Sequence, residues 1–172
     1  RFASMHLRHG IPCLGYRMTF KRKPIFNPDK AKRLGVPLRQ YKTLHAGQPV
    51  VLENGSQILP CMVLDGERRP ISLCYCTDTQ PFEEISSFAH GADLFVCEGM
   101  HGDGGMGEKM REKGHMVFTD SAGLARRAEA KRLWLTHFSP AMKEPEQYLA
   151  AARSVFEHTE VGYDGIRTTL GP

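Results

Sequence analysis

The sequence predicts an α/β protein built around a largely buried sheet. In the second half of its 172 residues, short apolar segments alternate with segments of helical character, the pattern of a layered α/β fold. The segments 71–76, 94–97 and 133–135 are strand-like because they are short and apolar and end at polar or turn-forming residues. The length fits one ordinary domain.

The first half carries local signals for three elements. Residues 8–20 predict a buried strand entered through a loop. Asn27 as N-cap and Pro28 at the first helical position predict a short helix that ends at Gly35. Residues 49–58 predict a hairpin with a type I′ turn at Asn54-Gly55.

The second half adds further elements around the three strands. Helices are expected over 82–90, 119–130 and 145–156, and strands over 160–163 and 166–169. The glycine-rich stretch 99–107 is expected to be a mobile loop. It lacks the GxxxxGK[ST] order of a phosphate loop, so nucleotide binding there is not expected.

Composition excludes several classes of protein. With 41% hydrophobic and 24% charged residues the chain can bury a core, which excludes wholesale disorder. No apolar run approaches the roughly 20 residues of a membrane helix, and the start of the chain is no signal peptide. Five cysteines without a CxxC pair predict reduced thiols in a cytoplasmic protein without membrane association.

Charge is distributed unevenly along the chain. Residues 1–60 hold eleven Lys/Arg and two Asp/Glu, a net charge of +9, whereas residues 61–172 have a net charge of −5. A basic segment on an acidic body suggests a polyanionic partner, because clustered bases release counterions from phosphates. A solvated surface segment explains the same charges equally well.

Three polar residues are expected where strands end: His9, Asp78 and His137. Imidazole nitrogens and carboxylate oxygens are zinc ligands, and a bridging carboxylate would hold two metals about 3.5–4 Å apart for phosphodiester hydrolysis. Each residue also has a structural explanation. Asp78 could be a turn or cap residue, and a single histidine at a strand end could be a hydrogen-bonded structural residue.

The chain resembles the ribonuclease Z family, the transfer-RNA 3′-processing branch of the metallo-β-lactamase fold. The motifs that carry the resemblance keep the family's order and separations: HGIPCLGYR at 9–17, CTDT at 76–79, GADL at 91–94 and LTHFS at 135–139. The resemblance covers essentially the whole chain but only the C-terminal half of the family. It implies a metallo-β-lactamase-like αβ/βα sandwich, of which residues 1–172 would form the C-terminal αβ half.

The resemblance also implies roles for individual residues. His9 and His137 match zinc-ligand histidines, and Asp78 matches the aspartate that bridges two zinc ions. His115 falls where the family has a histidine that assists the scissile phosphate or the leaving group. Glu98 is expected to orient His115 and to favour its protonated form.

A basic arm is implied between the first histidine and the aspartate. Bacterial family members insert there a flexible arm that clamps the elbow of a transfer RNA held by the other subunit of a homodimer. Residues 17–60 occupy this interval and carry nine of the eleven bases. The expected contacts to RNA backbone phosphates come from Lys21, Arg22, Lys23, Lys32 and Arg33.

The chain departs from the family in three places. It contains no HxHxDH segment, which supplies most of the family's zinc ligands and its proton acceptor, so a two-zinc site is not expected to be complete within this chain. Residues 97–100 (CEGM) and 115–117 (HMV) replace HEAT and HST, and residues 35–39 lack the Gly-Pro turn of the arm tip. We therefore expect a fragment, a truncated product or one partner of a split protein.

Three functions remain open at this level. The first is the C-terminal half of a zinc-dependent phosphodiesterase that removes the 3′ trailer from precursor transfer RNA. The second is a non-catalytic, basic RNA-binding fragment. The third is a hydrolase of the same fold that acts on a small phosphodiester or ester. In each case half a sandwich leaves one sheet face uncovered, so we expect dimerisation, binding of a missing N-terminal half, or poor solution behaviour.

Overall fold

The computed structural model describes residues 1–102 and 105–171. The chain divides into two compact units. The larger unit contains Arg1–Phe20 and the chain from Ile71 onward, and the smaller unit is Lys21–Pro70. The smaller unit overlaps the expected arm at 17–60. Its start differs because residues 17–20 complete a strand of the larger unit.

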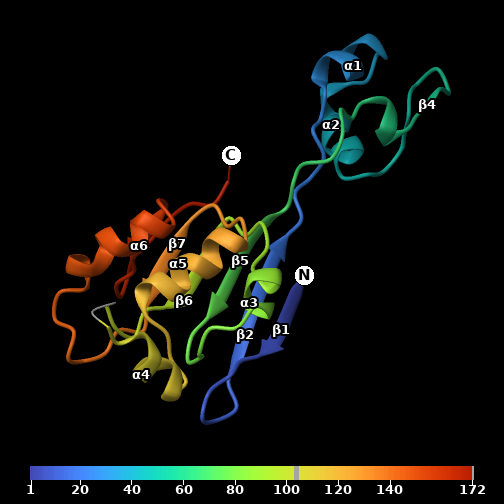
Figure 1. Ribbon diagram of the computed structural model, residues 1–172. Coiled ribbons are helices and arrows are strands. Elements are labelled where there is room, and N and C mark those ends of the chain that lie inside the picture. Colours follow the sequence, from blue (N-terminus) through green and yellow to red (C-terminus); the bar gives the residue numbers. More distant parts are fainter. Residues whose placement is uncertain (103–104, 172) are drawn as a thin grey trace. The chain divides into compact units, whose positions relative to one another are not determined.

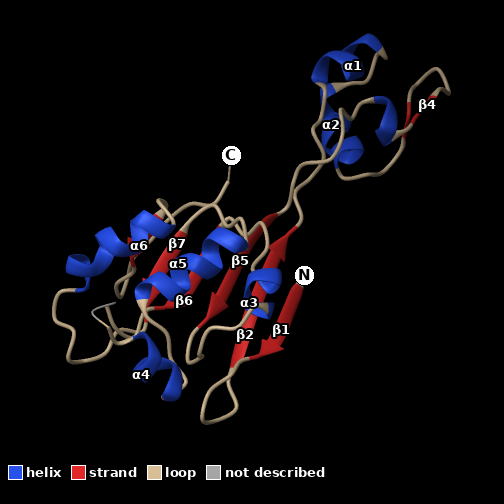
Figure 2. Cartoon of the chain, viewed as in Figure 1, coloured by secondary structure: helices blue, strands red, loops and turns tan. Residues whose placement is uncertain are grey.

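The larger unit is built on one mixed sheet (Figures 1 and 2). Its strands, in spatial order, are β1 (Phe2–His6), β2 (Leu14–Phe20), β5 (Ile71–Cys76), β6 (Leu94–Glu98), β7 (Leu133–Thr136) and β8 (Thr159–Val161). β1, β2 and β5 pair antiparallel, whereas β5 to β8 are parallel. The carboxyl ends of β5, β6 and β7 therefore meet at one edge of the sheet.

Helices cover one face of this sheet (Figure 1). They are α3 (Glu84–Phe88), α5 (Phe118–Arg127) and α6 (Leu149–Val155), the last preceded by a 3₁₀ turn at Pro145–Tyr148; the short helix α4 (Gly107–Glu112) leads into α5. Alternate strand residues such as Cys74, Phe95 and Leu135 point into this interface and are fully buried against the helices. This burial of apolar area stabilises the unit.

Large apolar side chains on the opposite face of the sheet are exposed. Phe20 is 58% exposed and Phe2 62%, and Leu14 and Tyr75 are each 40% exposed. The pairing register places these residues on the same side of β1, β2 and β5. We call these four residues the exposed sheet face. Large apolar side chains exposed on one sheet face mark an interaction site or promote association.

The smaller unit has its own core. It contains α1 (Pro28–Arg33), α2 (Leu38–His45), the short hairpin β3 (Val50–Val51) and β4 (Gln57–Ile58), and a 3₁₀ turn at Pro60–Met62. Leu44 and Val63 are fully buried in its core. Within residues 21–70 there are ten Lys/Arg and four Asp/Glu, so the unit carries a net charge of +6.

Most predicted elements of the larger unit are confirmed. The strand at 71–76 is confirmed at both ends, and the helices at 82–90 and 119–130 are shorter than expected. The helix at 145–156 is interrupted, because its first turn is 3₁₀. The strand at 166–169 is wrong, since the chain turns at Gly165 (φ +86°) and makes no ladder there.

In the smaller unit, the helix start at Asn27 is confirmed, with its side chain accepting a hydrogen bond from the Lys30 backbone at 3.0 Å. The hairpin is confirmed, but its type I′ turn is wrong because only Gly55 of the pair has positive φ. The glycine-rich stretch 99–107 includes residues 103–104, which lie outside the described residues; α4 begins at its end. None of the described helices is long and apolar enough to cross a membrane.

Candidate metal centre

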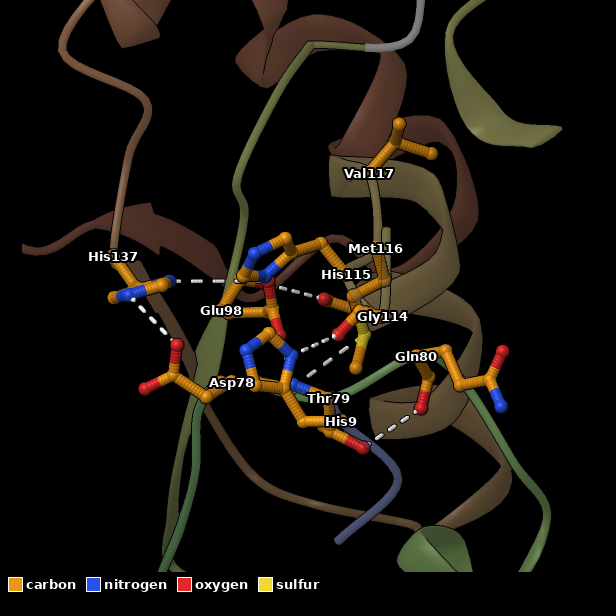
Figure 3. Close-up of polar contacts among 12 residues, drawn as sticks. His9, Asp78, Thr79, Gln80, Glu98, Gly114, His115, Met116, Val117 and His137 are labelled. Atoms are coloured by element: carbon orange, nitrogen blue, oxygen red, sulfur yellow. Dashed lines mark hydrogen bonds and ion pairs between the residues drawn. The ribbon is translucent and has the colours of Figure 1, made fainter. Parts of the chain in front are cut away.

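Three of the predicted residues lie at the carboxyl edge of the parallel strands. Asp78 follows β5 by two residues, Glu98 is the last residue of β6, and His137 directly follows β7. Nε2 of His137 lies 3.2 Å from Oδ1 of Asp78 (Figure 3). The sheet therefore brings together side chains that are up to 59 residues apart in sequence, at the edge where α/β sheets carry their sites.

Two further histidines reach the same place from loops. His9 lies in the loop between β1 and β2, and His115 lies in the connection between α4 and α5. The ring centroids of His9 and His115 are 4.8 Å apart, and those of His115 and His137 are 5.6 Å apart. All five predicted catalytic and metal-ligand residues thus converge in one cluster (Figure 3). Their roles stay predictions.

Glu98 is the buried centre of this cluster, with no exposed area. Its Oε1 accepts a hydrogen bond from the Thr79 backbone N–H at 2.5 Å, and its Oε2 lies 2.9 Å from Nδ1 of His115. Burial raises the pKa of Glu98 to about 8, although the backbone N–H groups of Thr79 and Met116 oppose the shift. Glu98 is therefore placed to orient the His115 ring.

The environment of His115 opposes the expected protonated form, which stays a prediction. Burial lowers the pKa of His115, and the neighbouring rings of His9 and His137 lower it further. The favourable charge of Asp78 is a smaller influence. The contact with Glu98 holds the ring with its Nδ1 facing the carboxyl group, at 2.9 Å from Oε2.

Backbone strain is concentrated at two of these residues. Asp78 has φ +57° and His137 has φ +59°, a left-handed conformation that non-glycine residues rarely adopt. Each such residue costs on the order of 1–3 kcal/mol, and such strain clusters at functional sites because the surrounding structure must enforce it. Both residues lie within two positions of a strand end, where the core fixes the backbone.

The donor atoms suit a metal ion. Two groups of three ligand atoms lie within 4.8 Å of one another: His9, Asp78 and His115, and Glu98, His115 and His137. Among the described residues, the buried Nδ1 of His137 has no hydrogen-bond partner, and Oε2 of Glu98 lies 3.9 Å from it. Nitrogen and carboxylate donors at such spacing fit zinc, and a metal would satisfy the unpaired nitrogen.

Sequence similarity extends over nearly the whole chain. A protein called ribonuclease Z from Clostridium acetobutylicum is 47% identical over 156 residues, which cover 91% of this chain and 50% of the relative. Another from Clostridioides difficile is 41% identical over 98% of this chain and 55% of the relative. The resemblance to ribonuclease Z is confirmed. The chain spans about half the length of the ribonuclease Z relatives that it matches, and no protein-family profile matches it.

Solved structures agree on the fold. The metallo-beta-lactamase fold protein YhfI from Bacillus subtilis superposes with a TM-score of 0.60 over 96% of this chain and 47% of that protein. The short form of human tRNase Z gives a TM-score of 0.55 over 99% of this chain and 43% of that protein. Both are 16% identical to this chain, so they show the metallo-β-lactamase fold alone.

The predicted RNA-binding residues lie in the smaller unit. Arg22 is half-buried, and the other four, Lys21, Lys23, Lys32 and Arg33, are exposed. Lys32 and Arg33 belong to the last turn of α1, whereas the other three precede that helix. Their exposure suits contact with phosphates, and their role in RNA binding stays a prediction.

Sequence reasoning missed two residues that support the cluster. Thr79 is fully buried; its backbone N–H donates to Glu98, and its side-chain oxygen accepts the backbone N–H of Arg8 at 3.1 Å. Gly114 contacts His9, with the carbonyl oxygen 3.0 Å from Nδ1. The position of Thr79 directly after Asp78 was a usable signal, whereas nothing local to Gly114 indicates a partner 105 residues away.

Proposed function

We propose that this chain forms about half of a zinc-dependent phosphodiesterase of the ribonuclease Z type, which removes the 3′ trailer from precursor transfer RNA in the cytoplasm. The observation that carries the proposal is the convergence of His9, Asp78, Glu98, His115 and His137 at the carboxyl edge of the sheet. The similarity to ribonuclease Z supports the substrate class.

In this proposal His9, Asp78 and His137 hold zinc. When bound, zinc supplies an activated water and stabilises negative charge on the phosphate. His115 presents the ring edge that does not face Glu98 to the substrate and passes a proton to the leaving oxygen. Glu98 fixes the orientation of that ring, and its proton replaces the one transferred.

The surroundings of His9 suit an anionic substrate. A cavity of about 260 Å³ is lined by His9, Arg8, Arg111 and Lys113, together with Gln80 and Glu112. Carboxylates pair with both guanidinium groups, Glu84 with Arg8 at 3.4 Å and Asp120 with Arg111 at 2.6 Å. Arginines held in this way lose little side-chain entropy when they contact phosphate, so the cavity suits the RNA backbone beside the reacting phosphate.

The smaller unit is the inserted arm of this proposal. Its net charge of +6 and its exposed bases suit sequence-independent contact with RNA phosphates. We propose that it contacts a transfer RNA that is cleaved at the cluster of the partner subunit in a homodimer.

The remaining zinc ligands have to come from outside these residues, because the sequence contains no HxHxDH segment. The relatives are about twice as long as this chain, and the exposed sheet face offers an apolar surface for a second αβ layer. We propose that a polypeptide with HxHxDH completes the centre by packing there.

The test combines the chain with a polypeptide that carries the HxHxDH segment, in the presence of zinc. A 3′-extended transfer RNA and a small phosphodiester are offered as alternative substrates. Cleavage at the 3′ trailer that is lost in His115→Ala, and retained in the control His158→Ala, is the expected result. His158 is a suitable control because it is an exposed histidine just before β8. If zinc binds and neither substrate is cleaved, the proposal is wrong.

A second candidate function is non-catalytic RNA binding by the chain alone. It is favoured by the smaller unit, which combines a separate core with a positive surface. The same experiment separates the two candidates. If the chain, combined with the HxHxDH polypeptide and zinc, binds RNA but does not cleave it, non-catalytic RNA binding is supported. Cleavage of the small phosphodiester alone would instead support a related hydrolase.

A further inference from the structure

The end of helix α4 places two adjacent residues in the cluster. The Gly114 N–H donates to the Arg111 carbonyl at 2.9 Å, and the His115 N–H donates to the Met110 carbonyl at 2.8 Å. This pair of bonds is a Schellman motif, in which the first residue beyond the helix cap adopts a left-handed conformation. Gly114 does so with φ +77°, a conformation that glycine adopts without strain.

Gly114 also lies against His9. Its carbonyl oxygen is 3.0 Å from Nδ1 of His9 (Figure 3). A Cβ atom built on Gly114 would lie 2.8 Å from the same nitrogen and 3.3 Å from the His9 Cα. Contacts under 3 Å are essentially absent for real Cβ atoms, so a side chain here would push the His9 ring away.

The contact also fixes the chemical state of the ring. A carbonyl oxygen only accepts hydrogen bonds, so Nδ1 of His9 carries the hydrogen. In a neutral imidazole the other nitrogen, Nε2, then has the free lone pair. Carbonyl groups in this position orient metal-binding histidines and set which nitrogen binds the metal.

We propose that Gly114 is a positioning residue for His9, which holds the ring with Nδ1–H toward the α4 end and Nε2 free for a metal. The inference rests on the proposed function only in that His9 is a metal ligand. Because His115 follows directly, the same helix end positions both imidazoles, one through Gly114 and the other through Glu98.

The test is a double-mutant cycle with Gly114→Ala and His9→Ala, followed by thermal unfolding. Gly105→Ala is a matched control, because Gly105 has the same φ of +77° and a Cβ there meets nothing within 4 Å. We expect Gly114→Ala to lower Tm further than Gly105→Ala does. This difference in Tm loss between the two glycine variants should become smaller in the His9→Ala background, because the imidazole that the new Cβ would contact is then absent. Equal losses for the two glycine variants would overturn the proposal.

Two further measurements isolate positioning from folding. Nitrogen NMR of the His9 ring in the metal-free, unmutated chain should show the Nδ1–H tautomer; the Nε2–H tautomer would overturn the proposal even if Gly114→Ala does not fold. Zinc Kd, measured by chelator competition, should rise about tenfold or more in Gly114→Ala and stay unchanged in Gly105→Ala. If the tautomer is Nδ1–H and the unmutated chain binds no zinc, positioning by Gly114 stands and the proposed metal function fails.

Discussion

Glu98→Gln should abolish the fall in the free energy of unfolding that the native chain is expected to show as pH rises. The folded protein keeps Glu98 protonated up to a pKa of about 8, whereas the ordinary value is 4.5. Between these values the native state binds a proton that the unfolded state has released. The free energy of unfolding therefore falls as pH rises through this range, and glutamine, which does not titrate, abolishes the fall.

The magnitude follows from the two pKa values. At 1.36 kcal/mol for each pH unit, the difference between 4.5 and about 8 amounts to about 5 kcal/mol as an upper limit. His115 acts in the opposite direction, because its lowered pKa removes stability as pH falls below its ordinary value of 6.5. The range from pH 6.5 to 8 isolates Glu98, and about 2 kcal/mol of the fall should occur there.

Urea unfolding of the chain at several pH values, with a chelator to exclude metal, measures this directly. The amide introduced by Glu98→Gln keeps an oxygen to accept the Thr79 N–H, so folding should be preserved. Glu112→Gln is the matched control because Glu112 is exposed near the same cluster. A native chain whose stability is constant or rises from pH 6.5 to 8 would refute the reasoning, as would a Glu98→Gln variant that retains the fall.

Three further predictions concern packing, association and RNA. Gly102→Ala should lower the free energy of unfolding by about 1–3 kcal/mol, because its Cβ would lie 2.1 Å from the Tyr148 ring. Chemical unfolding measures this loss, which should be smaller when Tyr148 is replaced by alanine. Phe20→Ser on the exposed sheet face should weaken self-association of the isolated chain in sedimentation experiments; a native chain that is a clean monomer with a sharp melt would contradict this. Replacing three bases of the smaller unit by alanine should lower RNA affinity and reduce the slope of log Kd against log salt concentration by about three. Arg126→Ala, in the larger unit, is the control. The three bases are Lys21, Arg22 and Lys23.

The residues of the cluster that follow strands could be predicted from the sequence, because parallel strands end at the same edge of a sheet. Apolar runs followed at once by Thr-Asp-Thr or Thr-His place Asp78 and His137 at strand ends. Neighbouring parallel strands share one carboxyl edge, so such residues meet without any further information. Glu98 was accessible in the same way, as the last residue of its strand.

Other elements could not be predicted because their signals are weak or depend on distant contacts. β1 has partly exposed residues on both faces and is defined by its pairing with β2, so its local pattern is poor. α2 begins without a side-chain cap after Pro37, and α4 begins at Gly107, the last residue of the glycine-rich stretch. The pKa of His115 is lowered by burial and by the neighbouring rings of His9 and His137, which no local pattern reveals.

Contacts within this chain hold the residues of the cluster in position, so a partner polypeptide would not have to order them. Thr79 joins the Arg8 backbone to Glu98, and the α4 end holds His9 through Gly114. The strain at Asp78 and His137 is likewise enforced by β5 and β7. A partner that supplies HxHxDH would therefore meet ligands already in place, so most of its binding free energy would come from covering the exposed sheet face rather than from ordering these five residues.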